Sequence, residues 1–204
     1  MTEVTVASIL EAARAQFLRT GVRRTSGDDI ARSAGVNRAT LYRRVGTKEE
    51  IVRATYVHET QRVLAVIEKA IGDVPTRDDD PHFDPVAYVE TFFTVTISQL
   101  RGNALLRQLL EVDREQTLLG LTLEAGDTLT LAATLSSDRL RKLRAYVGNT
   151  DVSDIEDLSG TFARLAQSLL LTPDAPPRLD TEARMRTYAR SVIAPMVLGR
   201  TTLA

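Results

Sequence analysis

The chain has 204 residues, of which 43% are hydrophobic, so it can bury a sizeable core in one domain or two small ones. It contains no cysteine, which excludes disulfides, thiolate metal sites and a cysteine nucleophile. No apolar run approaches the ~20 residues of a membrane-spanning helix, and residues 1–4 lack the start of a secretory signal, so a cytoplasmic location is expected.

The net charge of −1 hides an asymmetry along the chain. Residues 1–55 carry ten bases and six acids, a net charge of +4, whereas the remaining residues carry sixteen bases and twenty-one acids, a net charge of −5. A basic segment on an acidic chain suggests a polyanion as its partner, although solvated basic helix faces are common.

The apolar periodicity predicts an all-α fold of about nine helices without strands. Capping residues set several helix starts, namely Ser26, Asn37, Thr47 and Asp84. The expected helices cover residues 4–20, 26–34, 37–45, 47–71, 85–100, 105–110, 126–146, 153–171 and 180–198, with a short turn or helix at 114–121. Residues 72–84 are polar and contain two prolines, which indicates a surface loop.

Residues 26–48 have the pattern of a helix-turn-helix. Two short helices are joined at Gly35, where glycine lets the backbone turn without a Cβ clash. Small residues at Ala31 and Ala34 allow a close approach of the helices, and Ile30 and Leu41 point inward with them. Asn37 then starts the second helix, whose other face is free for a partner.

That second helix presents cations and hydroxyls, and in such motifs its first residues meet base edges in the major groove. Arg38 is the best candidate for base readout, because a guanidinium can bond guanine bidentately, and Ala39 could contact a thymine methyl group. The remaining side chains suit hydroxyl or phosphate contacts. The predicted DNA-binding residues are Ser26, Arg38, Ala39, Thr40, Tyr42, Arg43, Arg44 and Lys48.

Residues 25–50, with Asp29-Ile30-Ala31, Ala34-Gly35-Val36, Thr40-Leu41-Tyr42 and Lys48-Glu49 at these spacings, resemble the DNA-binding domain of the TetR family of repressors. The resemblance covers about residues 4–60, and Val45 departs from it where the family often has Phe. It implies a helix-turn-helix domain over residues 1–47 and an effector-binding and dimerisation domain over 48–204. It also implies a homodimer that a small molecule releases from a palindromic operator.

Two further sets of residues follow from this family arrangement, and each has a simpler explanation as ordinary core. Aromatic side chains of the second domain are candidates for the effector pocket: Tyr88, Phe92, Phe93, Tyr146 and Phe162. Apolar positions of the last two helices are candidates for the dimer interface: Leu165, Leu169, Tyr188, Val192 and Met196.

Other function classes have less support. The sequence shows no nucleophile–base pair, phosphate-binding glycine loop or metal-ligand spacing, so we expect neither an enzyme nor a cofactor or metal. His58 and His82 lack a paired carboxylate, and the charged residues 111–115 indicate a solvated helix junction. The alternative is a dimeric helical adaptor whose basic helix binds protein instead of DNA.

Overall fold

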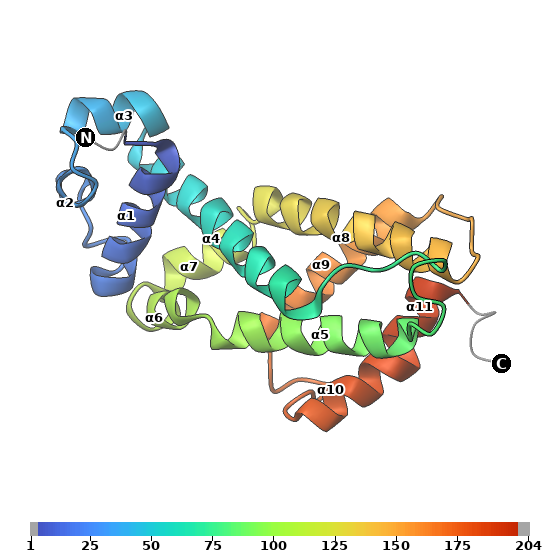
Figure 1. Cartoon of the computed structure of the whole chain (residues 1–204). Helices are drawn as coiled ribbons and strands as arrows, with labels where there is room; N and C mark the ends of the chain where they lie inside the picture. Colours follow the sequence, from blue (N-terminus) through green and yellow to red (C-terminus); the bar gives the residue numbers. More distant parts are fainter. Residues whose placement is uncertain (1–3, 200–204) are drawn as a thin grey trace. The chain divides into compact units, whose positions relative to one another are not determined.

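The computed structural model describes residues 4–199, and these residues form helices and loops without a strand (Figure 1). The helices are α1 (Val6–Thr20), α2 (Gly27–Ser33), α3 (Arg38–Val45), α4 (Lys48–Ile71), α5 (Pro85–Gly102), α6 (Ala104–Val112), α7 (Arg114–Leu121), α8 (Gly126–Tyr146), α9 (Ile155–Leu171), α10 (Glu182–Tyr188), the π-helical turn η1 (Ala189–Ile193) and α11 (Ala194–Leu198). The all-α prediction is confirmed. The described residues form ten helices rather than about nine when α10, η1 and α11 are counted as one.

Side-chain caps explain why the helices begin where they do. The Ser26 hydroxyl accepts from the Asp29 amide at 3.1 Å, and the Asn37 side chain accepts from the Thr40 amide at 2.8 Å. Each cap satisfies an amide that has no partner inside its helix. Thr47 and Glu50 form the reciprocal pair expected at the start of α4. These N-terminal boundaries are confirmed.

The chain divides into two compact units, each with its own core. Unit 1 comprises residues 4–62 and 102–128, and unit 2 comprises residues 63–101 and 129–199. The core of unit 1 includes Phe17, Leu41 and Leu109, so α6 packs into the same core as the three N-terminal helices. The core of unit 2 is built around Leu143 and Ile155. The boundaries of these compact units differ from the expected domain boundary after residue 47. The expected boundary divides the chain by function, and it stays a proposal.

A buried carboxylate connects three helices within unit 1. Glu59 of α4 is 4% exposed and accepts from Arg14 of α1 at 2.5 Å, from Arg62 at 2.9 Å and from the Asn103 amide at 2.6 Å. Asn103 also caps α6 through the Leu106 amide. Burial alone would raise the pKa of Glu59, but these hydrogen bonds lower it to about 2.

The last helix widens locally into a π-helical turn. The Ala194 amide donates to the carbonyl of Ala189, five residues back, instead of four. Pro195 follows immediately, and a proline inside a helix removes one amide donor and crowds the carbonyl of the previous turn. The apolar periodicity predicts an uninterrupted helix over residues 180–198, and the chain departs from it at this turn.

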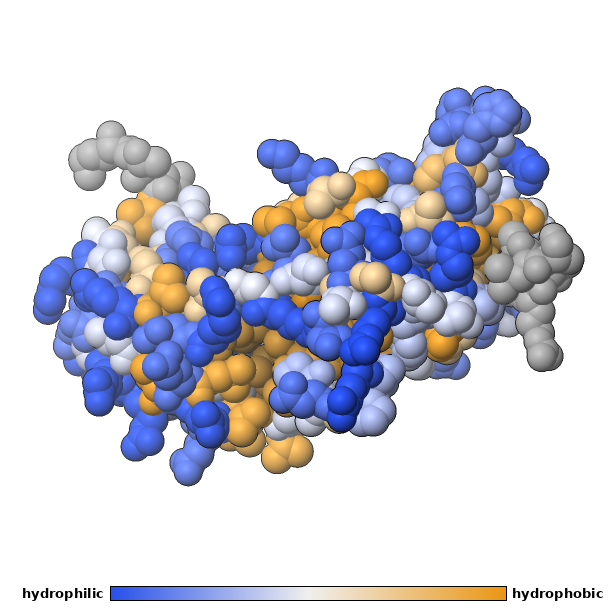
Figure 2. Space-filling view, turned by 90° about the horizontal axis from the view of Figure 1, so that it is seen from below, coloured by the Kyte–Doolittle hydropathy of each residue, from blue (hydrophilic) through white to orange (hydrophobic). Residues whose placement is uncertain are grey.

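The surface of the chain mixes hydrophilic and hydrophobic side chains. Figure 2 shows hydrophobic residues in several separate patches between hydrophilic ones. Among the helices of residues 4–199, none has the length and apolar character that crossing a membrane requires.

Candidate nucleic-acid interface

The helix-turn-helix of residues 26–48 has the local geometry that its sequence predicts. Gly35 adopts a positive φ of 69°, which an L side chain rarely adopts, and the Val36 amide donates to the Ala31 carbonyl at 3.0 Å. Ile30 of α2 and Leu41 of α3 are fully buried. Because Leu41 fixes one side of α3 in the core, the opposite side of this helix lies at the surface.

A close contact between α2 and α3 fixes the position of Tyr42. A Cβ atom at Gly27 would overlap the Tyr42 hydroxyl oxygen and lie 2.9 Å from the ring carbon Cζ. Glycine at the first position of α2 is therefore what lets the tyrosine ring pack against this helix. The role of Gly27, unlike that of Gly35, could not be predicted, because nothing in the local sequence shows which side chain approaches it.

Arg38, the predicted base-reading residue, is exposed at the start of α3. Its guanidinium lies 3.2 Å from the Asp28 carboxylate and 5.4 Å from the centre of the Tyr42 ring. The side chain is 63% exposed, and ion pairs this exposed contribute only about 0.2–1 kcal/mol. Arg38 can therefore leave Asp28 for a DNA partner at little cost.

The other predicted residues of α3 differ in how free they are. Ala39 and Arg43 are exposed, and Arg43 has no hydrogen bond or ion pair among the residues described. Thr40 is partly buried. Arg44 donates to the backbone carbonyl of Val4, which precedes α1. Arg43 is thus available for phosphate, whereas Arg44 also holds the segment before α1.

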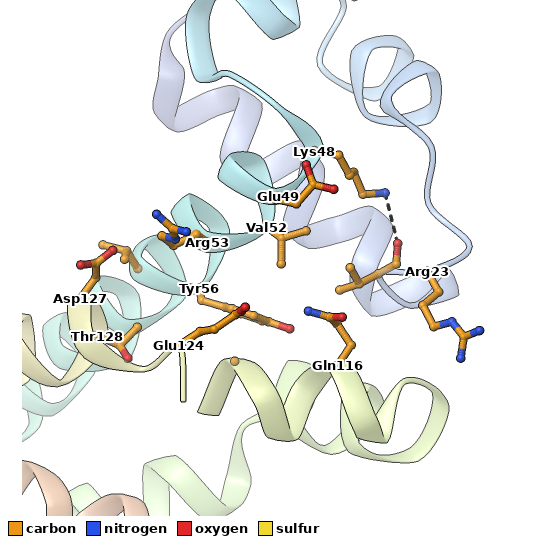
Figure 3. A pocket seen from close by; sticks show the side chains of 13 residues that line it. Arg23, Lys48, Glu49, Val52, Arg53, Tyr56, Gln116, Glu124, Asp127 and Thr128 are labelled. Carbon is orange, nitrogen blue, oxygen red and sulfur yellow. Dashed lines mark hydrogen bonds between the residues drawn. The ribbon is translucent and has the colours of Figure 1, made fainter. Parts of the chain in front are cut away.

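Ser26 and Lys48 have structural contacts in addition to their predicted role with DNA. The Ser26 hydroxyl caps α2 and donates to Asp29 at 2.6 Å. The Lys48 ammonium donates to the Val22 carbonyl at 3.2 Å (Figure 3). It also donates to the carbonyl of Thr25 in the α1–α2 loop. Burial lowers the pKa of Lys48. An ammonium has three N–H donors, so one remains for a phosphate and the contact stays a prediction.

Asp113 corrects the expectation of a solvated cluster at residues 111–115. It is 7% exposed and accepts from the Arg23 amide at 3.0 Å, so it anchors the α1–α2 loop. Gly21 adopts a positive φ, and a Cβ atom there would overlap the Asp113 carboxylate. The burial of Asp113 could not be predicted, because its partner, the Arg23 amide, lies 90 residues away in the sequence and most residues around Asp113 are polar.

The family model described as "Bacterial regulatory proteins, tetR family" matches residues 9–55, which contain α2, α3 and most of α1. The similarity to known relatives extends beyond this segment. An uncharacterised HTH-type transcriptional regulator of Mycobacterium tuberculosis is 28% identical over 195 residues, covering 95% of this chain and 88% of the relative. Residues 9–55 are a DNA-binding segment of the TetR family of transcriptional regulators.

Other comparisons agree with this family assignment. The HTH-type transcriptional regulator TtgR of Pseudomonas putida is 32% identical over 110 residues, covering 53% of this chain and 48% of TtgR. Two solved structures share the fold: the TetR-family repressor AlkX from Dietzia, with a TM-score of 0.62 and 18% identity over 97% of both chains, and the TetR-family repressor QsdR from R. erythropolis, with a TM-score of 0.63 and 20% identity over 94% and 92%.

Four of the aromatic residues predicted to line the effector pocket, Tyr88, Phe92, Phe93 and Phe162, lie in or against the core of unit 2. The fifth, Tyr146, is buried with its ring centroid 5.0 Å from that of Phe83, which packs against the same core. The Tyr88 hydroxyl donates to the Gly72 carbonyl at 3.1 Å and accepts from Arg139 at 2.5 Å. The Tyr146 hydroxyl donates to the Asp80 carbonyl at 2.8 Å. Both hydroxyls are therefore used in holding the loop before α5. Phe92, Phe93 and Phe162 are partly buried, and the pocket assignment stays a prediction for all five.

The residues predicted for the dimer interface are not equally accessible. Leu169 is 5% exposed and packs in a core cluster of its own chain, so it leaves little side chain for a partner. Leu165 and Tyr188 are partly buried against the same cluster. Val192 and Met196, at 38% and 42% exposed, lie one helical turn apart on the last helix and present apolar surface to solvent. Of the five, these two are the best placed for contact with a second copy.

The two histidines do not form a metal site. His58 lies 3.3 Å from the Glu11 carboxylate, so the expectation that it lacks a paired carboxylate is wrong. The amide of His82 donates to Asp80 in the loop before α5. Within residues 4–199 no three histidine, aspartate or glutamate side chains are grouped as metal ligands.

Proposed function

We propose that this regulator is a homodimeric repressor that binds a palindromic operator through α3 and is released by a small-molecule effector. The observation that carries the proposal is the exposed row of Arg38, Ala39 and Arg43 above the fully buried Leu41. A helix held in this way presents base-reading and phosphate-binding groups together, as a helix-turn-helix requires.

Dimer symmetry supplies the rest of the DNA recognition. Two copies related by a two-fold axis present two α3 helices, and half-sites about 34 Å apart place both in successive major grooves. Arg43, Arg44 and Lys48 supply phosphate contacts, and Arg38 supplies sequence preference. The apolar residues Val192 and Met196 are our candidates for the centre of the dimer interface.

Effector release requires a ligand that binds the free and DNA-bound forms with different affinity. We place the effector and dimerisation functions in residues 48–204 and the DNA-binding function in residues 1–47. The proposed mechanism involves no enzymatic step and no cofactor. Because its partner is DNA in a bacterial family, it also implies a cytoplasmic location.

The test is DNA-binding affinity measured by fluorescence anisotropy at several salt concentrations. The ligands are the upstream DNA of the chain's own gene and a shuffled duplex. The wild-type chain should prefer the upstream DNA, with an affinity that falls steeply with salt. Arg38→Ala should reduce that preference about tenfold or more, because one bidentate base contact contributes about 1–3 kcal/mol of discrimination.

The same measurement distinguishes a DNA-binding repressor from the alternative, a dimeric adaptor that binds protein. An adaptor predicts no sequence-selective, salt-sensitive binding by the wild-type chain. If Arg38→Ala weakens binding to both duplexes equally, Arg38 is not a base-reading residue.

A further inference from the structure

Unit 1 contains a cavity of about 290 Å³ that no function described above uses (Figure 3). Its walls come from the α1–α2 loop, the first turns of α4, α7 and the start of α8, all of which belong to unit 1. Its volume is near the lower end of the ~300–1,000 Å³ range of small-molecule sites. The cavity is therefore large enough for a small ligand.

Part of the cavity wall is apolar. Val22, Val52 and Val57 line it together with the ring of Tyr56. A Cβ atom at Gly120 would lie 2.7 Å from the ring carbon Cε2 of Tyr56, so glycine at this position of α7 leaves room for the ring. An apolar ligand body can pack on this surface and be removed from water.

The Tyr56 hydroxyl is a buried polar group without a hydrogen-bond partner. Its neighbour Thr117 already donates its own hydroxyl to the Asp113 carbonyl at 2.8 Å. Burial raises the pKa of Tyr56 to about 12, so the hydroxyl keeps its proton at neutral pH. Because this oxygen is buried, a ligand in the cavity would contact the tyrosine ring and not the hydroxyl.

The charges around this hydroxyl favour a positive ligand. The Lys48 ammonium is turned to the α1–α2 loop carbonyls, and Figure 3 shows Arg23 and Arg53 pointing away from Tyr56. Glu124 lies close enough for its negative charge to act on the Tyr56 hydroxyl. In the part of the chain that the structure describes, no basic side chain forms an ion pair with Glu124.

We propose that this cavity binds a small organic cation, an amine with an apolar body. The ammonium pairs with the Glu124 carboxylate, while the body packs on the valines and the tyrosine ring. The site is additional to the effector site proposed above, which draws on residues of unit 2. Binding here does not depend on the DNA-binding function.

The test is isothermal titration calorimetry of the full chain with three matched probes: phenethylamine, the neutral phenethyl alcohol and the anionic phenylacetate. Phenethylamine should bind at least about tenfold more tightly than the alcohol, because a hydrogen bond to a charged group contributes more than one between neutral groups. Phenylacetate should bind more weakly than the alcohol.

Variants assign the binding to this cavity. Glu124→Gln, at an exposed position, should weaken phenethylamine at least about tenfold and leave the alcohol unchanged. Glu115→Gln removes an exposed acid of α7 that does not line the cavity, and it should change neither affinity. Tyr56→Phe keeps the ring and removes only the buried hydroxyl, so it should leave the affinity for phenethylamine unchanged.

Several results would overturn the proposal. The first three are equal affinities for the amine and the alcohol, tighter binding of phenylacetate than of the alcohol, and an amine affinity that Glu124→Gln leaves unchanged. The fourth is the absence of binding heat from phenethylamine at concentrations up to about 10 mM, which would mean a dissociation constant too high for a specific site. DNA binding is measured separately on the same preparation. A protein that binds the amine but not DNA would contradict the repressor proposal and leave this one standing.

Discussion

Glu59 shows how one buried residue can make the stability of the DNA-binding unit depend on pH. Its pKa is about 2 in the folded chain, against 4.5 for an ordinary glutamate. Because the folded-state pKa is the lower one, the stabilisation is complete above about pH 4.5. It is lost as the pH falls from 4.5 to 2.

We predict that Glu59→Gln lowers the free energy of unfolding at pH 7 by roughly 2–4 kcal/mol, because Arg14 and Arg62 lose their buried counter-ion. Urea denaturation at pH 7 and pH 3 measures this. The difference between the wild-type and variant chains should shrink at pH 3, because Glu59 is then protonated in the unfolded wild-type chain and folding has to release that proton.

The matched control is Glu182→Gln, which breaks an exposed pair with Arg186. It should change the free energy of unfolding by less than about 1 kcal/mol. A Glu59→Gln effect that stays the same at both pH values would contradict the explanation by charge.

At the scale of the elements, the fit of α3 against α2 depends on Gly27. We predict that Gly27→Ala displaces Tyr42 and tilts α3, which lowers DNA affinity about tenfold or more, since misplaced contacts cost about 1–3 kcal/mol each. The measurement is anisotropy with the operator duplex, together with a thermal melt that shows the variant is folded.

Gly160→Ala is the control for this substitution, because a Cβ atom at Gly160 of α9 would meet nothing within 4 Å. It should leave DNA affinity unchanged and stabilise the helix by about 0.5–1 kcal/mol. The account of α3 is contradicted if Gly27→Ala binds the operator as the wild-type chain does.

Sequence patterns predicted the features of these elements that depend on near neighbours. Ser26, Asn37 and Thr47 cap amides three residues ahead, and Gly35 acts through its own backbone, so each is visible in a short stretch of sequence. The helix-turn-helix and its exposed face followed from these signals and from the burial of Leu41.

Contacts between distant residues could not be predicted in this way. Asp113 meets the Arg23 amide 90 residues away, and Glu59 meets Asn103 across 44 residues. Nothing near Asp113 or Glu59 in the sequence distinguishes a buried carboxylate from a solvated one. The cavity lined by Tyr56 and Glu124 was missed for the same reason, since its walls come from four separate segments.

For the whole molecule, the proposed dimer depends on the last helix. We predict that the double substitution Val192→Glu and Met196→Glu, at two exposed apolar positions, produces a folded monomer, because buried unpaired charges oppose association. Light scattering after size exclusion measures the mass. A dimer that persists in this variant would place the interface elsewhere.

The most direct test of the central claim, that α3 enters the major groove from two copies of the chain, is methylation protection of the operator with dimethyl sulfate. The reagent attacks guanine N7, which faces the major groove. The account predicts protected guanines in two half-sites about 10 base pairs apart, with the protection lost in Arg38→Ala. Bound DNA whose guanines stay fully reactive, or protection that Arg38→Ala leaves intact, would contradict it.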